Sequence, residues 1–206
     1  MVLVAAAFAR GGHRPTRVAC LGDSNTFALP PMTPPAWCQF LGEQLGSAGW
    51  ETRSFAYLGA TVTGDATASA FATAADHIAR AEAVWQPDVY ILSYGTNDIE
   101  ESRTPAEVVA AYERYRRTLI EKGRRVLVAT TPQLAPPASP RPGIVELNAL
   151  LRRSIPVTDL LDFDTVTDSS DYDPDGVRVE KRDGIHLNLE GQRKRAQAAR
   201  TAIDAP

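Results

Sequence analysis

Short apolar runs rich in β-branched residues alternate along this 206-residue chain with segments of helical periodicity. Such alternation is typical of a parallel sheet with helices packed on its faces. The runs that read as strands cover residues 17–21, 52–58, 88–94, 125–129 and 156–161. The sequence therefore predicts an α/β fold with an open parallel sheet of about five strands.

Helical segments between these runs carry apolar stripes. One stripe comprises Phe71, Ile78 and Trp85, and another comprises Val108, Tyr112, Tyr115 and Leu119. The second helix is expected to begin at Thr104-Pro105-Ala106-Glu107, because this segment combines a capping box with proline at the first helical position. It is expected to end at Gly123.

A last helix is predicted from a cap at Asn188 to about Ile203. It carries four basic residues that we interpret as a solvated face and not as an anion site. These are Arg193, Lys194, Arg195 and Arg200.

Length and composition indicate one globular domain over residues 17–206, preceded by an N-terminal arm over residues 1–16. The chain is 44% hydrophobic and 23% charged, and it has no apolar stretch long enough for a membrane span. Its net charge of −3 provides no basic field for nucleic acid or an anionic bilayer. We therefore expect no nucleic-acid partner and no membrane span.

The apolar N-terminal arm bears on the cellular compartment of the protein. Residues 1–9 are apolar but no basic segment precedes them, which disfavours a signal peptide and slightly favours the cytoplasm over secretion. The arm could pack on the domain, or on a second copy to form a homo-oligomer.

Cys20 and Cys38 are interpreted as small core residues, because two cysteines cannot form a disulfide framework.

Two short motifs carry the residue types needed for nucleophilic catalysis. Ser24, in Gly22-Asp23-Ser24, directly follows the first predicted strand at a turn that would lift its hydroxyl above the sheet edge. Asp183 and His186 are three residues apart, so the carboxylate can hold one ring nitrogen while the other faces the serine. The sequence therefore predicts a Ser24, His186, Asp183 triad that hydrolyses esters.

The other two histidines lack such a setting. His13 lies in a polar stretch near the N-terminus. His77 follows Asp76 inside an amphipathic helix, where we expect a surface or half-buried side chain.

Acyl hydrolysis also needs hydrogen-bond donors aimed at the developing oxyanion. Asn97 follows the third predicted strand, so its side-chain amide would lie at the same sheet edge as Ser24. Gly64 follows the second strand and could offer a backbone N–H with no side chain in the way. Gly59 is an alternative in the same region, but Gly64 is preferred because Asp65 follows it.

Four segments, those around Ser24, Gly64, Asn97 and His186, resemble in this order the sequence blocks of the SGNH hydrolase superfamily, the GDSL-type esterases and lipases. The resemblance covers about residues 17–200. The resemblance implies a flavodoxin-like, three-layer α/β/α sandwich, the triad Ser24, His186 and Asp183, and no metal or cofactor. It also implies an oxyanion hole made by the backbones of Ser24 and Gly64 and the amide of Asn97. Asp23 and Asp98 are expected to contact and position the triad and oxyanion-hole residues without touching the substrate themselves.

Two positions depart from the family pattern. The leucine often found after the nucleophile is Asn25 here, and the glycine commonly found four residues after the serine is Ala28. These departures concern the shape of the local loop and the acyl pocket, not the triad.

The expected substrates are short-chain acyl or acetyl esters, because no long apolar lid is evident to shelter a fatty chain. An acyltransferase that moves the acyl group to a sugar or alcohol hydroxyl is an alternative at the same site. A non-catalytic domain that binds carbohydrate or a partner is an alternative of another class. The proline-rich loops at residues 29–35 and 132–143 are expected to wall a substrate cleft.

An acidic segment resembles half of a calcium loop. Asp171-Tyr172-Asp173-Pro174-Asp175-Gly176 has the first three ligand positions and the glycine, but position twelve is Arg182. A cation there would repel the metal, so we interpret residues 162–175 as a solvated loop, with calcium binding as the alternative.

Overall fold

The computed structural model describes residues 14–27, 35–64, 72–135, 138, 141–172 and 184–204. Five parallel strands form one sheet in the order β2-β1-β3-β4-β5. The strands are β1 (Thr16–Gly22), β2 (Trp50–Ser54), β3 (Val89–Ser93), β4 (Arg125–Ala129) and β5 (Leu160–Leu161). The predicted five-stranded parallel sheet is confirmed, and its strand order is that of flavodoxin-like folds.

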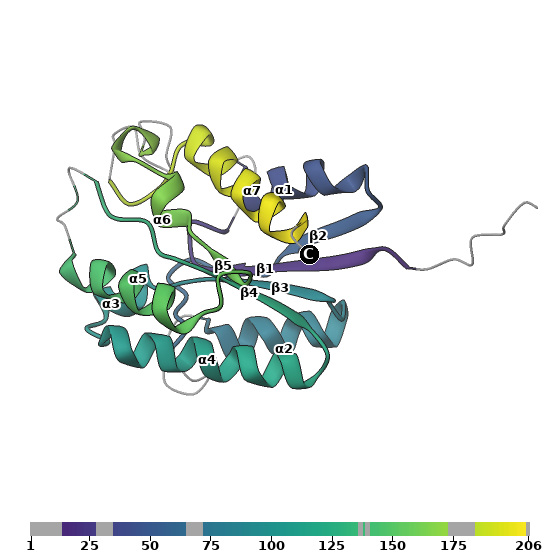
Figure 1. The fold of residues 1–206 in the computed structure, drawn as a ribbon, viewed down its shortest axis with the longest axis horizontal. Coiled ribbons are helices and arrows are strands. Elements are labelled where there is room, and N and C mark those ends of the chain that lie inside the picture. Colours follow the sequence, from purple (N-terminus) through teal and green to yellow (C-terminus); the bar gives the residue numbers. More distant parts are fainter. Residues whose placement is uncertain are drawn as a thin grey trace, which may run out of the picture.

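Helices cover both faces of this sheet (Figure 1). The helices are α1 (Trp37–Gly46), α2 (Ala74–Val84), α3 (Thr96–Glu100), α4 (Pro105–Glu121), α5 (Pro142–Ser154), α6 (Phe163–Val166), the short 3-10 helix η1 (Ser169–Asp171) and α7 (Leu189–Asp204). Helices α1 and α7 lie on one face, and α2, α4 and α5 lie on the other (Figure 1). The fold is the expected three-layer α/β/α sandwich.

Strand β1 is buried on both faces because its side chains alternate between two cores. Val18 and Cys20 pack in the core under α1 and α7. Ala19 and Leu21 pack in the core under α2, α4 and α5. A central strand of a parallel sheet is covered on both sides, which explains the continuous apolar run in the sequence.

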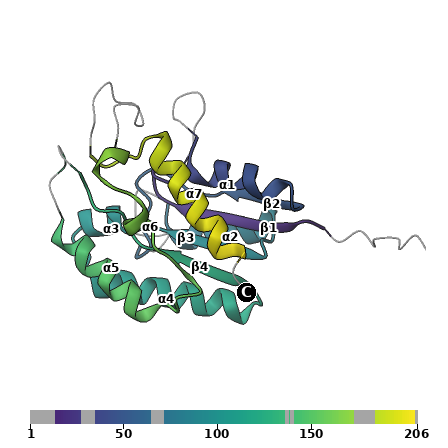
Figure 2. The same cartoon turned by 45° about the horizontal axis from the view of Figure 1, so that its top comes forward.

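The carboxyl ends of the strands lie at one edge of the sheet, as the turned view in Figure 2 also shows. At this edge Gly22 of β1 pairs in register with Ser93 of β3. The segments that carry Ser24 and Asn97 therefore leave the sheet from adjacent strands at the same level.

Two predicted strand boundaries were wrong. The second strand starts and ends earlier than predicted, because β2 is an edge strand whose register with β1 covers Trp50–Ser54 only. The fifth strand is shorter than predicted because residues 156–159 form a turn, closed by a hydrogen bond from the Asp159 N–H to the Pro156 carbonyl.

The predicted helix starts are confirmed. Thr104 and Glu107 form the capping box of α4, with proline at its first turn. Asn188 accepts a hydrogen bond at 2.9 Å from the backbone N–H of Gly191 at the start of α7. Both capping groups satisfy N–H donors that have no partner within the helix.

Two polar residues are more buried than predicted. Arg195 of α7 is 1% exposed and packs its guanidinium 5.2 Å from the ring centre of Phe163, so it does not belong to a solvated face. His77 of α2 is 5% exposed, and its Nδ1 lies 2.7 Å from the Tyr94 hydroxyl. Burial lowers the pKa of His77 to about 4, with smaller effects from Asp76 and Arg80, so the imidazole is neutral near pH 7.

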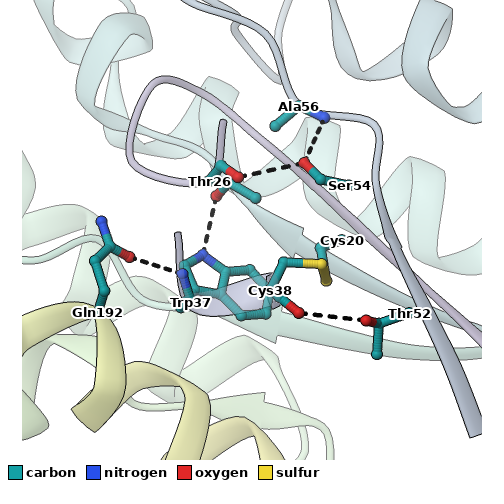
Figure 3. The surroundings of a disulfide bond; sticks show 8 residues. All are labelled: Cys20, Thr26, Trp37, Cys38, Thr52, Ser54, Ala56 and Gln192. Atoms are coloured by element: carbon teal, nitrogen blue, oxygen red, sulfur yellow. Dashed lines mark hydrogen bonds between the residues drawn. A yellow bond between two sulfur atoms is a disulfide. The ribbon is translucent and has the colours of Figure 1, made fainter. Parts of the chain in front are cut away.

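Cys20 and Cys38 are joined by a disulfide, which corrects the prediction of two unlinked core residues. Their predicted burial is confirmed, at 0% and 2% exposure. The bond links β1 to α1 (Figure 3). Disulfides persist in oxidising compartments and are rare in the cytosol, so this bond counts against a cytoplasmic location.

We expect this disulfide to stabilise the fold by about 3 kcal/mol, because it closes a loop of moderate length in the unfolded chain. The two cysteines are 18 residues apart. The double variant Cys20→Ala, Cys38→Ala should therefore melt roughly 6–12 °C lower than the unsubstituted protein. Reductant should lower the melting temperature of the unsubstituted protein and leave the double variant unchanged. Complete reduction, verified by thiol titration, without any loss of stability would contradict this expectation.

Candidate active site

Ser24 lies in a tight turn directly after β1, which we call the nucleophile turn (residues 23–27). The backbone N–H groups of Thr26 and Phe27 both donate to the Asp23 carbonyl at 3.0 Å. The Asn25 N–H donates to Asp23 Oδ1 at 2.9 Å. These bonds bury Asp23 and leave Ser24 half-buried.

Gly22 allows this turn to start close to the neighbouring strand. A Cβ at this position would lie 2.5 Å from the Ser93 carbonyl oxygen and 2.3 Å from Thr26 Oγ1. Only glycine fits such an approach without displacing backbone.

The base of the nucleophile turn is tied to helices on one face of the sheet (Figure 3). Trp37 of α1 donates from Nε1 to Thr26 Oγ1 at 3.2 Å. The backbone N–H of Trp37 donates to Gln192 Oε1 of α7 at 3.0 Å. Residues of α1 and α7 therefore hold the turn from this face of the sheet.

His186 reaches Ser24 from the other end of the chain. Its Nε2 lies 2.9 Å from Ser24 Oγ, within hydrogen-bond distance. His186 is half-buried like Ser24, so a substrate could approach both. The predicted pair is therefore brought together, while Asp183, the predicted orienting carboxylate, lies outside the described residues.

The segment before His186 depends on a glycine that the sequence analysis did not single out. Gly184 has a φ of 72°, and a Cβ there would lie 1.7 Å from the Ala135 carbonyl oxygen. The Ala135 N–H donates to the Gly184 carbonyl at 2.9 Å. The loop after β4 thus packs directly against the segment that carries His186. In the sequence, the glycine two residues before His186 was the signal that could have predicted this close packing.

Asn97 lies in α3, directly after β3. Its Nδ2 donates to the Ala60 carbonyl at 3.0 Å, and an amide nitrogen carries a second hydrogen. Asn97 is half-buried, as is Gly64.

Asp98 links α3 to the loop that carries Gly64. Its buried carboxylate accepts the backbone N–H groups of Val62 and Thr63 and the Thr63 hydroxyl, at 2.8–3.1 Å. These residues immediately precede Gly64. The Asp98 carboxylate thus holds the backbone next to Gly64, the predicted donor.

The buried carboxylates Asp23 and Asp98 are sequence neighbours of the half-buried Ser24 and Asn97. Burial raises the pKa of Asp23 to about 6, although the Asn25 N–H and the charges of Arg195 and His186 oppose this shift. Burial also raises the pKa of Asp98, against the lowering effect of its N–H and O–H donors. The charge of Arg195, a residue whose burial the sequence analysis missed, favours the ionised form of Asp23. Burial lowers the pKa of Arg195 to about 10.

The first aspartate of the calcium-like motif is buried, which corrects the interpretation of a solvated loop at this position. Asp171 is 1% exposed, and its Oδ2 accepts the Asp168 N–H and the Lys194 ammonium, each at 2.8 Å. Its carboxylate is thus already engaged within the fold. Residues 173–176 and Arg182 lie outside the described residues.

Neither a metal cluster nor a membrane span is found in the part of the chain that the structure describes. Within the described ranges, no group of three or more His, Cys, Asp or Glu side chains is arranged to hold a metal ion. None of the helices seen there is both long and apolar enough to cross a membrane. Most of the first proline-rich loop, and residues 136–137 and 139–140 of the second, lie outside the described residues.

The model of the GDSL-like lipase/acylhydrolase family matches residues 20–194, which include Ser24, Gly64, Asn97 and His186. The chain belongs to this family. It is therefore a carboxylic ester hydrolase of the GDSL/SGNH type. A search of curated proteins found no match.

Solved structures share the fold of this family member at low sequence identity. An aryl esterase from M. smegmatis and the carbohydrate acetylesterase Est24 from Sinorhizobium meliloti each have a TM-score of 0.70 and 22% identity. Each match covers 91% of this chain and 98% of the other. TesA matches with a TM-score of 0.64 and 21% identity, over 92% of this chain and 98% of its own.

Proposed function

We propose that this GDSL-family hydrolase is a serine esterase in which Ser24 is the nucleophile and His186 the general base. The observation that carries the proposal is the 2.9 Å contact between Ser24 Oγ and His186 Nε2. A hydroxyl is a weak nucleophile until an adjacent base accepts its proton, and this distance allows that transfer. Asp183 is proposed to hold the other ring nitrogen, so that Nε2 is the proton acceptor.

The reaction proceeds in two acyl-transfer steps. As Ser24 Oγ forms a bond to the ester carbonyl carbon, its proton passes to His186 Nε2 and the carbonyl oxygen becomes an oxyanion. The carbon–oxygen bond to the alcohol then breaks, and His186 returns the proton to the departing oxygen. Water attacks the acyl-enzyme in the same way, which releases the acid and restores Ser24.

The oxyanion is proposed to be held by the Ser24 and Gly64 backbone N–H groups and the Asn97 amide. Support comes from the bonds that immobilise these donors before substrate binds. Asp98 fixes the backbone before Gly64, and the Ala60 carbonyl orients the Asn97 amide. Donors that are already oriented need not reorganise in the transition state.

We propose short-chain acyl esters, acetyl esters foremost, as substrates. Two proteins of the same fold are an aryl esterase and a carbohydrate acetylesterase, which supports a small acyl group and leaves the alcohol portion variable. The proposed acyl preference agrees with the absence of a long apolar lid segment in the sequence.

A fluorophosphonate probe followed by peptide mapping tests the nucleophile directly. We expect one adduct, on Ser24, that is missing from Ser24→Ala. Hydrolysis of p-nitrophenyl esters from acetate to palmitate tests the substrate class, and we expect kcat/KM to be highest for acetate to butyrate. An adduct on another residue would refute the proposed nucleophile, and a preference for palmitate would refute the proposed substrate class.

A further inference from the structure

Asn25, the residue after the proposed nucleophile, bonds to both neighbours of His186. Its Nδ2 donates to the Ile185 carbonyl at 3.2 Å, and its Oδ1 accepts the Leu187 N–H at 3.3 Å. The side chain is 6% exposed, so water competes little for these bonds. One planar amide thus spans the backbone on either side of the histidine.

The same residue is also fixed to the rest of the fold through its backbone. Its N–H donates to Asp23 Oδ1 at 2.9 Å, and its carbonyl accepts Gln192 Nε2 at 3.3 Å. All of its hydrogen-bonding groups therefore have partners on the nucleophile turn, on α7 or on the histidine segment. Asn25 is the side chain through which these three elements meet.

We propose that Asn25 is a positioning residue that sets the distance between Ser24 and His186. Asn25 directly follows Ser24, and its two partners directly flank His186. The two hydrogen bonds of the Asn25 side-chain amide therefore fix His186 relative to Ser24. This proposal rests on the proposed function of Ser24 and His186. It also gives a physical role to the position at which this chain departs from the leucine often found in the family.

The pair of hydrogen bonds from the Asn25 side chain to Ile185 and Leu187, called the bridge below, requires a donor and an acceptor on one short side chain. Aspartate has the same shape and could still accept the Leu187 N–H, but its second oxygen would face the Ile185 carbonyl without a hydrogen between them. Leucine offers neither group, and alanine leaves both backbone groups without this partner. The three variants therefore remove the bridge in different ways.

The chain contains a matched control in Asn148. This asparagine is 0% exposed, and its side-chain amide also makes two backbone hydrogen bonds, to the N–H and carbonyl of the single residue Thr131 at 2.8 Å and 2.6 Å. It has no bond to the histidine segment among the bonds described. Asn148→Ala therefore reports what the loss of a buried amide bridge does to stability alone.

The test compares kcat, KM and melting temperature for p-nitrophenyl acetate hydrolysis, together with the rate of fluorophosphonate labelling. A displacement of a reacting group by about 1 Å can cost about 100-fold. We expect kcat and the labelling rate to fall about 10- to 100-fold in Asn25→Ala and Asn25→Asp, with KM within about threefold. Asn25→Leu should also be slow, and Asn148→Ala should lose stability but retain most of kcat.

Folded Asn25→Ala and Asn25→Leu proteins with unchanged kcat and labelling would refute the positioning role. The same loss of kcat in Asn148→Ala would also refute it, because the effect would then follow from stability. No labelling of the unsubstituted protein would instead refute the proposed function. The two failures are therefore distinguishable.

Discussion

Alanine in place of Ser24 is expected to lower kcat for p-nitrophenyl acetate by about 10⁵- to 10⁶-fold, as loss of a triad member does in other serine hydrolases. Without Oγ no acyl-enzyme can form, and His186 Nε2 loses the hydroxyl that lies 2.9 Å away. Steady-state assays with high enzyme concentration measure the residual rate. The melting temperature should change little, because Ser24 is half-buried and its hydroxyl packs in no core.

A matched control and a double variant sharpen this result. Ser154 is exposed at the end of α5, so Ser154→Ala should keep full activity. His186→Ala should be nearly as slow as Ser24→Ala, and the double variant should be no slower than either, because the two groups act as a unit. Additive losses would show that Ser24 and His186 do not work in the same step.

The sheet was predictable because its signals are local. Buried parallel strands are continuous apolar runs, and β4 was predicted at its observed boundaries, Arg125–Ala129. The capping box at Thr104 likewise marks a helix start by residues only three apart. Edge strand β2 was misplaced, since an edge strand takes its limits from its one partner and not from its own sequence.

The meeting of Ser24 and His186 was also predicted, but from the residue types of a triad. The strand pattern places only Ser24 of this pair at the sheet edge, because none of the five described strands leads directly into His186. What the pattern could not give were contacts that depend on how helices seat on the sheet. Arg195 lies on the buried side of α7 with Ala199 and Ile203, and its position in that stripe was the overlooked signal. The cysteines share a core because α1 packs on the same face of β1 that Cys20 occupies.

Asn25 shows the same limit at the site itself. Its place after Ser24 was visible in the sequence, but its partners are about 160 residues away. A departure from a family pattern identifies a position worth examining, whereas its role follows only from the contacts that the fold provides.

Replacement of Asn97 by alanine is expected to lower kcat by about 10²- to 10³-fold, equivalent to roughly 2.7–4 kcal/mol of transition-state stabilisation. The amide would contribute to the oxyanion more than to the ground-state carbonyl, so KM should change little. Asn97→Asp should be at least as slow, because a carboxylate donates no N–H and would place negative charge beside the oxyanion. Stopped-flow or steady-state assays on p-nitrophenyl acetate provide kcat and KM separately.

The hydrogen bond from Asn97 to the Ala60 carbonyl suggests another reason why the Asn97→Ala variant could be slow, namely a displaced loop. The experiment must separate this effect from loss of an oxyanion donor. If Asn97 served only to hold that loop, its loss would lower the melting temperature and raise KM as the loop shifts. If it binds the oxyanion, kcat falls even where the folded protein remains as stable as before. A kcat within about threefold of the unsubstituted enzyme would be far below the loss that removal of an oxyanion donor causes, and would exclude Asn97 from that role.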